Sequence, residues 1–189
     1  RESSDPFRIL IACVLSLRTK DRTTADASRR LFAQADDPVS MAALPEGGLA
    51  RLIYPVGFYR TKARQIIAIC RQLLACHQGR VPASLDELLS LPGVGRKTAN
   101  LVLTVGYGKP GICVDIHVHR ISNRWGYVRT KTPEQSEFAL RKKLPRRYWI
   151  RYNDLLVPFG QNVCLPVSPW CSRCKVATYC ARVGVTRSR

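Results

Sequence analysis

Apolar residues recur along most of this chain at the three- and four-residue spacing of amphipathic helices. The stretch from Thr61 to His77 shows this most clearly, because one side of the expected helix is apolar and the other is basic or amide. Its apolar side is formed by Ile66, Ile67, Ile69, Cys70, Leu73 and Leu74. No stretch shows the convincing apolar–polar alternation of a half-buried strand. The pattern therefore predicts an all-α fold of about ten helices.

Capping residues, prolines and glycines mark where these helices begin and end. We expect helices over these ranges: Ser4 or Asp5 to Leu17, Asp21 to about Phe32, 38–44, 47–54, Thr61 to His77, Ser84 to Ser90, Gly95 to Tyr107, Ile116 to Trp125, from Thr132 onward, and Pro145 to Gly160. Ser84 and Glu87 have the spacing of a capping box. Pro158 is expected to kink the last helix or end it early, because proline lacks the N–H that a helix interior uses.

The charge balance is strongly basic, with 31 Lys and Arg against 13 Asp and Glu and a net charge of +18. Such an excess favours a polyanionic partner, because each phosphate that a basic side chain neutralises releases condensed counterions. Nucleic acid fits best, and the alternatives are an anionic membrane surface, an acidic protein or a merely solvated basic surface. No apolar run reaches the roughly 20 residues of a membrane span, and we expect no membrane partner.

Eight cysteines fall into two groups with different surroundings. Cys13, Cys70, Cys76 and Cys113 lie in apolar, helix-like segments, where a thiol packs as a small hydrophobe. The other four crowd into residues 164–189 with the spacing C-x6-C-x2-C-x5-C, at Cys164, Cys171, Cys174 and Cys180. This asymmetry favours a reducing compartment and one metal site over four disulfides. Thiolate ligands suit either zinc or an iron–sulfur cluster.

Residues 91–95, with the sequence LPGVG, separate two expected helices. Two glycines spaced by one residue permit positive φ angles and a close approach of the backbone. The turn presents backbone N–H groups at a helix N-terminus, where a phosphate can bind, although an ordinary turn between helices has the same two glycines. The longer string over residues 91–100, LPGVGRKTAN, resembles the helix–hairpin–helix of DNA glycosylases, and specifically that of the endonuclease III family.

Lys97 and Asp115 are the expected catalytic residues. A helix N-terminus and the neighbouring Arg96 both disfavour a cation at Lys97, which favours the neutral, nucleophilic amine over a plain surface charge. Asp115 is expected to cap the helix that starts at Ile116, and a carboxylate so held stays ionised and can stabilise positive charge on a sugar. Lys97 falls on the catalytic lysine of the endonuclease III family, and Asp115 lies in a V-D-x-H string like that of the family's catalytic aspartate.

A metal site is the alternative for Asp115, His117 and His119. Alternate residues share one face of a strand, but on a helix residues two apart diverge by roughly 200°. Because this segment is expected to be helical, the metal interpretation is disfavoured, and His117 is given no firm role.

The resemblance extends from Pro6 to Cys180 and implies two helical domains flanking a DNA-binding cleft. One is a six-helix domain over residues 1–109 with the helix–hairpin–helix at about 84–106, and the other is a helical iron–sulfur domain over 110–189. The resemblance also implies that the four C-terminal cysteines hold a [4Fe–4S] cluster rather than zinc. The family often has basic, DNA-facing residues between the first two cysteines. Residues 165–170 are uncharged here, which argues against phosphate contact by that segment and leaves Arg173, Lys175 and Arg182 as substitutes.

The residues expected to bind DNA are Arg18, Phe58, Leu91, Gly93, Val94, Gly95 and Arg96. Phe58 falls on the apolar wedge that the family inserts into the duplex, with a core aromatic as the alternative. Arg18 stands where the family commonly has glutamine. An arginine there would fill the gap left by an extruded base and would change the preference for the opposite base.

The resemblance, together with compatible chemistry at Lys97 and Asp115, implies a base-excision repair DNA glycosylase with abasic-site lyase activity through a lysine Schiff base and β-elimination. It would act as a monomer on oxidised pyrimidines in damaged double-stranded DNA. The alternatives are a monofunctional adenine or thymine mismatch glycosylase and a non-catalytic DNA-binding module. The expected location is the cytoplasmic nucleoid in a bacterium, or the nucleus or mitochondrion in a eukaryote. Because the chain opens on Arg1 and its only methionine is Met41, we expect a fragment or processed product whose missing N-terminus would hold any targeting signal.

Overall fold

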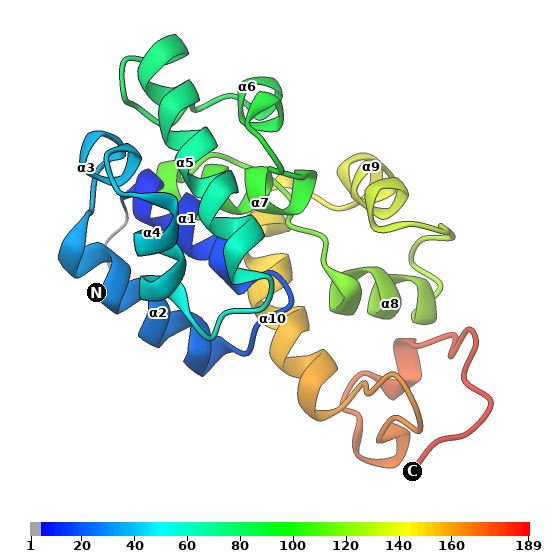
Figure 1. Ribbon diagram of the computed structural model, residues 1–189. Coiled ribbons are helices and arrows are strands. Elements are labelled where there is room, and N and C mark those ends of the chain that lie inside the picture. The colour runs from blue at the N-terminus through cyan, green and yellow to red at the C-terminus, as the bar shows by residue number, and fades with distance from the viewer. Residues whose placement is uncertain (1–4) are drawn as a thin grey trace. The chain divides into compact units, whose positions relative to one another are not determined.

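All regular elements of the computed structural model, which describes residues 5–189, are helices (Figure 1). The all-α prediction is therefore confirmed. The internal contacts of the chain divide it into two compact units between Lys109 and Pro110, and each unit has a buried apolar core of its own. Within the described range, no helix is both long and apolar enough to cross a membrane.

The first unit is built around its first and its longest helix, which supply many of its fully buried apolar side chains. Its elements are α1 (Pro6–Ser16), α2 (Asp21–Gln34), α3 (Pro38–Ala42), α4 (Glu46–Ile53), α5 (Tyr59–Cys76), α6 (Leu85–Ser90), α7 (Arg96–Leu101) and the π-helical turn η1 (Val102–Gly106). Helix α5 packs against α3 and α4, and α1 packs against α2, α5, α7 and η1. Leu10 and Leu15 of α1 and Ile66 and Leu73 of α5 have no exposed surface, so most of the predicted amphipathic pattern positions this core. Leu74, which the pattern predicts on the same side, is 37% exposed, because it lies about 100° around the helix from Leu73.

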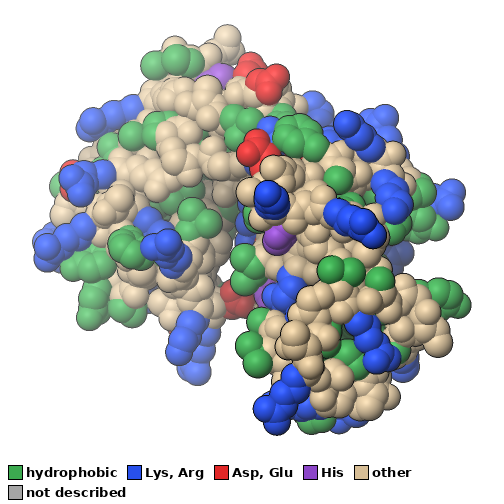
Figure 2. Space-filling model, turned by 90° about the vertical axis from the view of Figure 1, so that its right-hand side faces the viewer, with side chains coloured by type: hydrophobic (Ala, Val, Ile, Leu, Met, Phe, Trp, Pro, Cys, Tyr) green, Lys and Arg blue, Asp and Glu red, His purple; other side chains and the backbone are tan. Residues whose placement is uncertain are grey.

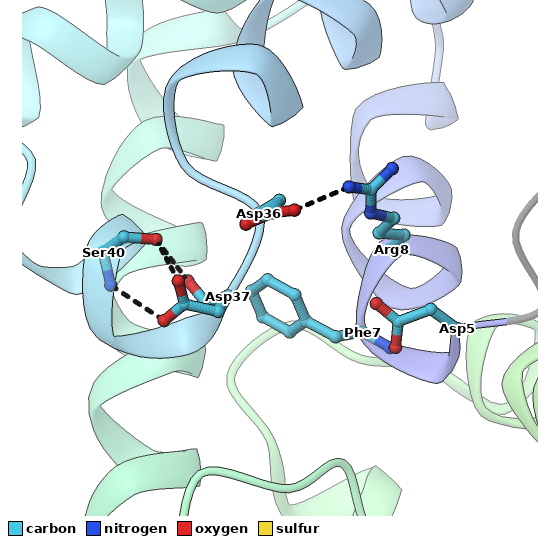
Figure 3. Close-up of polar contacts among 6 residues, drawn as sticks. All are labelled: Asp5, Phe7, Arg8, Asp36, Asp37 and Ser40. Atoms are coloured by element: carbon cyan, nitrogen blue, oxygen red, sulfur yellow. Dashed lines mark hydrogen bonds and ion pairs between the residues drawn. The ribbon is translucent and has the colours of Figure 1, made fainter.

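Two aspartates cap the N-termini of α1 and α3, which lie close together in Figure 3. The Asp5 carboxylate accepts the N–H of Phe7 at 3.0 Å, and Asp37 accepts the N–H groups of Val39 and Ser40 at 2.7 and 3.0 Å. Hydrogen bonds from the Ser40 side chain and backbone lower the pKa of Asp37, which favours an ionised cap on α3. Ser4, the alternative start of α1, lies outside the described residues.

The second unit is smaller and is centred on the contact between α8 and α10. Its elements are α8 (Ile116–Arg124), α9 (Pro133–Lys143), η2 (Arg146–Tyr148), α10 (Trp149–Asn162), η3 (Cys171–Arg173) and η4 (Ala177–Tyr179). Val118 and Ile121 of α8 are fully buried, and Ser122 meets the Tyr152 hydroxyl of α10 at 3.0 Å. As predicted, Thr132 caps α9 by accepting the N–H of Gln135 at 3.2 Å.

Two details of the predicted helix ends are wrong. Pro158 does not end the last helix early, because α10 runs through it to Asn162. The carbonyl that loses its donor belongs to Asp154, and since both Asp154 and Pro158 are exposed, water can replace the missing bond. Ser84 occupies the N-cap of α6, but its hydroxyl accepts no N–H from the helix, so the capping box does not form. The buried Leu88 anchors this short helix to the core instead.

Candidate active site and DNA-binding loops

The turn between α6 and α7 has the hairpin form that the sequence predicts. Gly93 has a φ angle of +68°, and a Cβ atom at this position would collide with the side-chain amide of Gln65. That amide, from α5, donates a hydrogen bond to the Pro92 carbonyl at 3.1 Å. The left-handed φ angle favours glycine at this position, because L side chains rarely adopt it, and the Gln65 bond fixes the hairpin to the body of the first unit.

The other hairpin residues differ in what they can present to a ligand. Leu91 and Val94 are 2% and 6% exposed, so their side chains anchor the turn in the core. The N–H of Val94 already donates to the Leu91 carbonyl at 3.1 Å. Gly93 and Gly95 are exposed, and no side chain caps the first turn of α7. If this turn binds a phosphate, the exposed glycine backbone and the first N–H groups of α7 are the groups that it offers.

Lys97 lies in the first turn of α7 and its side chain is exposed. That turn contains no acidic residue. Sequence reasoning missed the neighbour of Lys97, which is the buried Cys13 of α1. Burial raises the pKa of the Cys13 thiol to about 11, while the positive charge of Lys97 acts in the opposite direction. Cys13 is therefore a neutral thiol at physiological pH and does not compete with Lys97 as a nucleophile.

Asp115 belongs to the second unit and is 8% exposed. Its Oδ1 atom accepts the N–H groups of His117 and Val118 at 2.9 and 2.8 Å, which makes it the N-cap of α8 as predicted. Because two backbone donors hold the carboxylate, its position is fixed by the start of the helix. The local sequence alone thus determines the orientation of this side chain.

The helical conformation of α8 separates the two histidines that follow Asp115. The Nδ1 atom of His117 lies 3.1 Å from a guanidinium nitrogen of Arg120, whereas the Nδ1 atom of His119 lies 2.7 Å from the Ser136 hydroxyl. Burial lowers the pKa of His119, which favours its neutral form. Among residues 5–189 no three histidine, cysteine or acidic side chains are grouped so as to hold a metal ion, and the metal interpretation of this segment is not supported.

Arg120 and Gly160 form a close junction between α8 and α10 that the sequence patterns did not reveal. Arg120 donates to the carbonyls of Gly160 and Cys164 at 3.1 and 2.9 Å. A Cβ atom on Gly160 would lie only 2.5 Å from the His117 ring, so a larger residue would force the helices apart. This junction connects the helix that Asp115 caps to the first of the four C-terminal cysteines.

Arg18 and Phe58 lie on two loops of the first unit that meet at their tips. Both residues have left-handed backbone conformations, with φ angles of 54° and 58°. Phe58 is 61% exposed, which rules out the core-aromatic alternative, and Arg18 is exposed as well. The Arg18 guanidinium lies 5.5 Å from the centre of the Phe58 ring, so the two side chains form one exposed cation–π pair.

The four C-terminal cysteines line one pocket in the second unit. Aromatic and basic side chains complete its wall, including Trp125, Phe159, Trp170, Arg124 and Arg182. Arg124 is buried and donates to the Cys164 sulfur at 3.3 Å and to the Leu165 carbonyl at 2.7 Å. The backbone N–H of Arg182 donates to the Cys180 sulfur at 3.4 Å. Two of the four sulfurs therefore receive N–H hydrogen bonds, and the Cys180 thiol also donates to the Arg124 carbonyl at 3.7 Å.

The segment that carries these cysteines has almost no apolar core. Between residues 164 and 189 only Cys164 and Pro169 are buried, and the regular structure is limited to the single turns η3 and η4.

Lys and Arg side chains are spread over the face shown in Figure 2, where acidic side chains are few. The basic excess is thus displayed on the surface, as a polyanion-binding protein requires.

The sequence and the fold of this chain both resemble those of known DNA-repair proteins. The family model described as HhH-GPD superfamily base excision DNA repair protein matches residues 11–146. Endonuclease III of Thermotoga maritima is 50% identical over 179 residues, which cover 95% of this chain and 84% of that protein. A structure of a trapped endonuclease III–DNA covalent intermediate is 38% identical with a TM-score of 0.88, covering 94% of this chain and 84% of the other. A thermostable thymine-DNA glycosylase is 25% identical with a TM-score of 0.86, covering 96% and 85%.

The helical fold, the hairpin and the family match define a DNA glycosylase of base-excision repair with a helix–hairpin–helix. Within this class, the sequence identity to endonuclease III over nearly the whole chain identifies the family. The chain belongs to the endonuclease III family. The predictions of the fold class, of an enzyme and of base-excision repair are thereby confirmed, and DNA is its partner.

Proposed function

We propose that this glycosylase removes oxidised pyrimidines from damaged double-stranded DNA and then cuts the strand through a Schiff base on Lys97. The observation that carries the proposal is the exposed Lys97 amine at the start of α7, directly after the Gly93 hairpin. An amine in that place can form a covalent bond to a sugar that the hairpin holds by its phosphates.

Extrusion of the damaged nucleotide is the first step of the proposed reaction. Unstacking one base costs a few kcal/mol, and a side chain must fill the space that the base leaves. The exposed cation–π pair of Arg18 and Phe58 supplies an apolar ring and a planar donor group side by side. We assign Phe58 as the wedge and Arg18 as the residue that bonds to the orphaned opposite base.

Glycosidic cleavage is the second step. The neutral Lys97 amine attacks the anomeric carbon of the sugar, and the bond to the base breaks with its electron pair leaving on the base, which takes up a proton. The ionised Asp115 carboxylate stabilises the positive charge that develops on the sugar. Its N-cap hydrogen bonds hold the carboxylate in one orientation, so no reorganisation is needed as that charge appears.

Strand cleavage is the third step. As the sugar ring opens, the bond between the anomeric carbon and the ring oxygen breaks and a proton from the Lys97 nitrogen passes to that oxygen. The nitrogen lone pair then forms an iminium ion between Lys97 and the anomeric carbon. Removal of a proton from the adjacent carbon then expels the 3′ phosphate by β-elimination. Water hydrolyses the imine and regenerates the Lys97 amine. The exposed position of Lys97 leaves room for this covalent intermediate.

A [4Fe–4S] cluster held by Cys164, Cys171, Cys174 and Cys180 is the cofactor that we propose. When bound, it would supply a structural cross-link to a segment that buries only two of its residues. The four cysteines line one pocket, which is compatible with a shared metal site. Their spacing has one C-x2-C pair, where structural zinc sites commonly have two, and this favours the cluster over zinc.

We expect Cys171→Ser to remove the visible absorption of the purified protein and to expose residues 164–189 to trypsin. The physical reason is that the metal replaces an apolar core there. Cys76→Ser is the matched control, because Cys76 is an exposed cysteine at the end of α5. Iron, sulfide and zinc analysis of the wild-type protein completes the test. Stoichiometric zinc without sulfide would contradict the cluster assignment.

A monofunctional mismatch glycosylase remains the second candidate, because the thymine-DNA glycosylase structure shares this fold. Borohydride reduction distinguishes the two, since it traps only an enzyme that forms an imine. We expect trapping on duplexes that contain thymine glycol or an abasic site. Excision of a mismatched base without any trapped adduct would favour the second candidate. A protein that acts on none of these duplexes would favour a non-catalytic DNA-binding module.

The proposed monomeric state is tested separately, by light scattering of the same samples.

A further inference from the structure

Lys62 is a buried lysine in the first turn of α5, with only 5% of its surface exposed. Its ammonium group donates three hydrogen bonds, to the Leu15 carbonyl at 2.8 Å, the Leu17 carbonyl at 2.5 Å and the Thr19 hydroxyl at 3.2 Å. All three acceptors are neutral oxygens, so the charge is held by dipoles rather than by a carboxylate. The carbonyls belong to the C-terminal end of α1, where the helix dipole favours a cation.

The Thr19 hydroxyl extends this contact to the opposite loop. It accepts the N–H of Gly57 at 3.1 Å and donates to the Leu17 carbonyl at 3.3 Å. A Cβ atom on Gly57 would lie 2.7 Å from the Arg18 carbonyl, so glycine is needed for the loops to approach this closely. Lys62, Thr19 and Gly57 therefore join the loop that follows α1 to the loop that precedes α5.

Arg18 and Phe58 each lie one residue from this junction. Both are in the left-handed conformation, which costs free energy for non-glycine residues and persists only where the surroundings hold it. The Lys62 ammonium bonds to the Leu17 carbonyl and the Thr19 hydroxyl on either side of Arg18, and the Gly57 N–H bonds to the same hydroxyl beside Phe58. Backbone bonds from Thr19 to Ser16 and from Lys62 to Phe58 support the same two loops. The exposed cation–π pair is thus carried by two loops that the buried Lys62 ammonium helps to join.

We propose that Lys62 is a positioning residue that locks the two loops together, so that Arg18 and Phe58 enter the duplex as one preformed wedge. The inference rests on the proposed function of those two side chains. It adds a residue that acts on the extrusion of the nucleotide and not on the bond-breaking steps at Lys97.

The chemistry of the group suits this role. An ammonium has three donors, which matches the three oxygens that surround it. Burial lowers the pKa of Lys62 to about 8, so at pH 7 about nine in ten molecules carry the charged form. A methionine would fill a similar volume but would leave two helix-end carbonyls and the Thr19 hydroxyl without this donor.

The test compares Lys62→Met with the wild-type protein on two abasic substrates, a duplex and a single strand, by the rate of borohydride trapping. The single strand has no stacked partner to replace, so only the duplex requires the wedge. We expect the duplex rate to fall roughly 10- to 100-fold, as misplacement of a positioning group does, and the single-strand rate to remain within about twofold. The fluorescence of 2-aminopurine opposite the abasic site should also rise less than with the wild-type protein, because fewer opposite bases are unstacked.

Lys109→Met is the matched control. Lys109 is a lysine of the same unit that donates to a carbonyl, that of Ala83 at 2.6 Å, but it is exposed and lies outside the two loops. It should leave the ratio of duplex to single-strand rates unchanged. Thr19→Val, which removes the shared hydroxyl and keeps the lysine, should lower that ratio in the same direction as Lys62→Met.

The outcomes separate the inference from the function on which it rests. An unchanged duplex rate in Lys62→Met overturns the positioning role. If Lys62→Met is trapped slowly on both substrates, the Thr19→Val variant provides the test. An equal loss of the duplex rate and the single-strand rate in Thr19→Val also overturns the positioning role. A wild-type protein that is trapped on neither substrate refutes the proposed lyase reaction and, with it, this inference.

Discussion

A Lys97→Gln variant will bind damaged duplex DNA but will form no borohydride-stable adduct, and its strand cleavage will fall by about 10³-fold or more. Glutamine keeps the length and the hydrogen-bonding capacity of the side chain but has no nucleophilic amine. Because Lys97 is exposed at the start of α7, its replacement opens no cavity in the core, and the melting temperature should stay within a few degrees.

Trapping and cleavage assays on a thymine glycol duplex, with binding measured in parallel, check this result. Lys109→Gln serves as the control for charge, because it removes the same charge from another exposed position of the first unit. Retention of the trapped adduct in Lys97→Gln would show that another amine is the nucleophile. A loss of binding as large as the loss of cleavage would show that Lys97 only holds phosphate.

An Asp115→Asn variant will lose about 10²- to 10³-fold in the turnover number for base excision while keeping its stability. Asparagine caps a helix about as well as aspartate, so the bonds to the N–H groups of His117 and Val118 should persist. The negative charge is lost, however, and with it the stabilisation of the positively charged sugar. The expected result is an inactive protein with an intact α8.

Single-turnover excision and thermal melting, measured on the same preparations, check this result. Asp37→Asn is the matched control, because Asp37 caps α3 through the same pair of bonds, to the N–H groups of Val39 and Ser40. It should leave excision unchanged. If Asp115→Asn lowers the melting temperature much more than Asp37→Asn does, the carboxylate is mainly structural and its catalytic role is wrong.

What could be predicted from the sequence was determined by neighbours in the chain. The helical stripe of α5, the cap at Asp115 and the turn at Gly93 each depend on residues within one or two helical turns, and each agrees with the structure. The assignment of Lys97 came from a string of ten residues that resembles a known family. Composition predicted a polyanionic partner but could not identify the surface that binds it.

What could not be predicted depends on residues far apart in the chain. Lys62 contacts residues 43 to 47 positions away, so no local pattern shows that its charge is buried. One signal was present, because Lys62 lies four residues before Ile66 and so falls on the apolar side of α5. A lysine in that position indicates either a long side chain that reaches solvent or a buried partner, and the structure shows the second. The charge interaction between Cys13 and Lys97 and the close approach of Gly160 to His117 likewise join residues far apart in the chain.

The scarcity of buried side chains after Cys164 also bears on how this part of the molecule can diverge. A packed core restricts the volume of nearly every residue that lines it, whereas residues 164–189 bury only Cys164 and Pro169. Substitutions between the cysteines therefore meet little steric resistance. The uncharged run over residues 165–170 is a change that such a segment tolerates, and variation among related chains should concentrate there while the spacing of the four thiols stays constant.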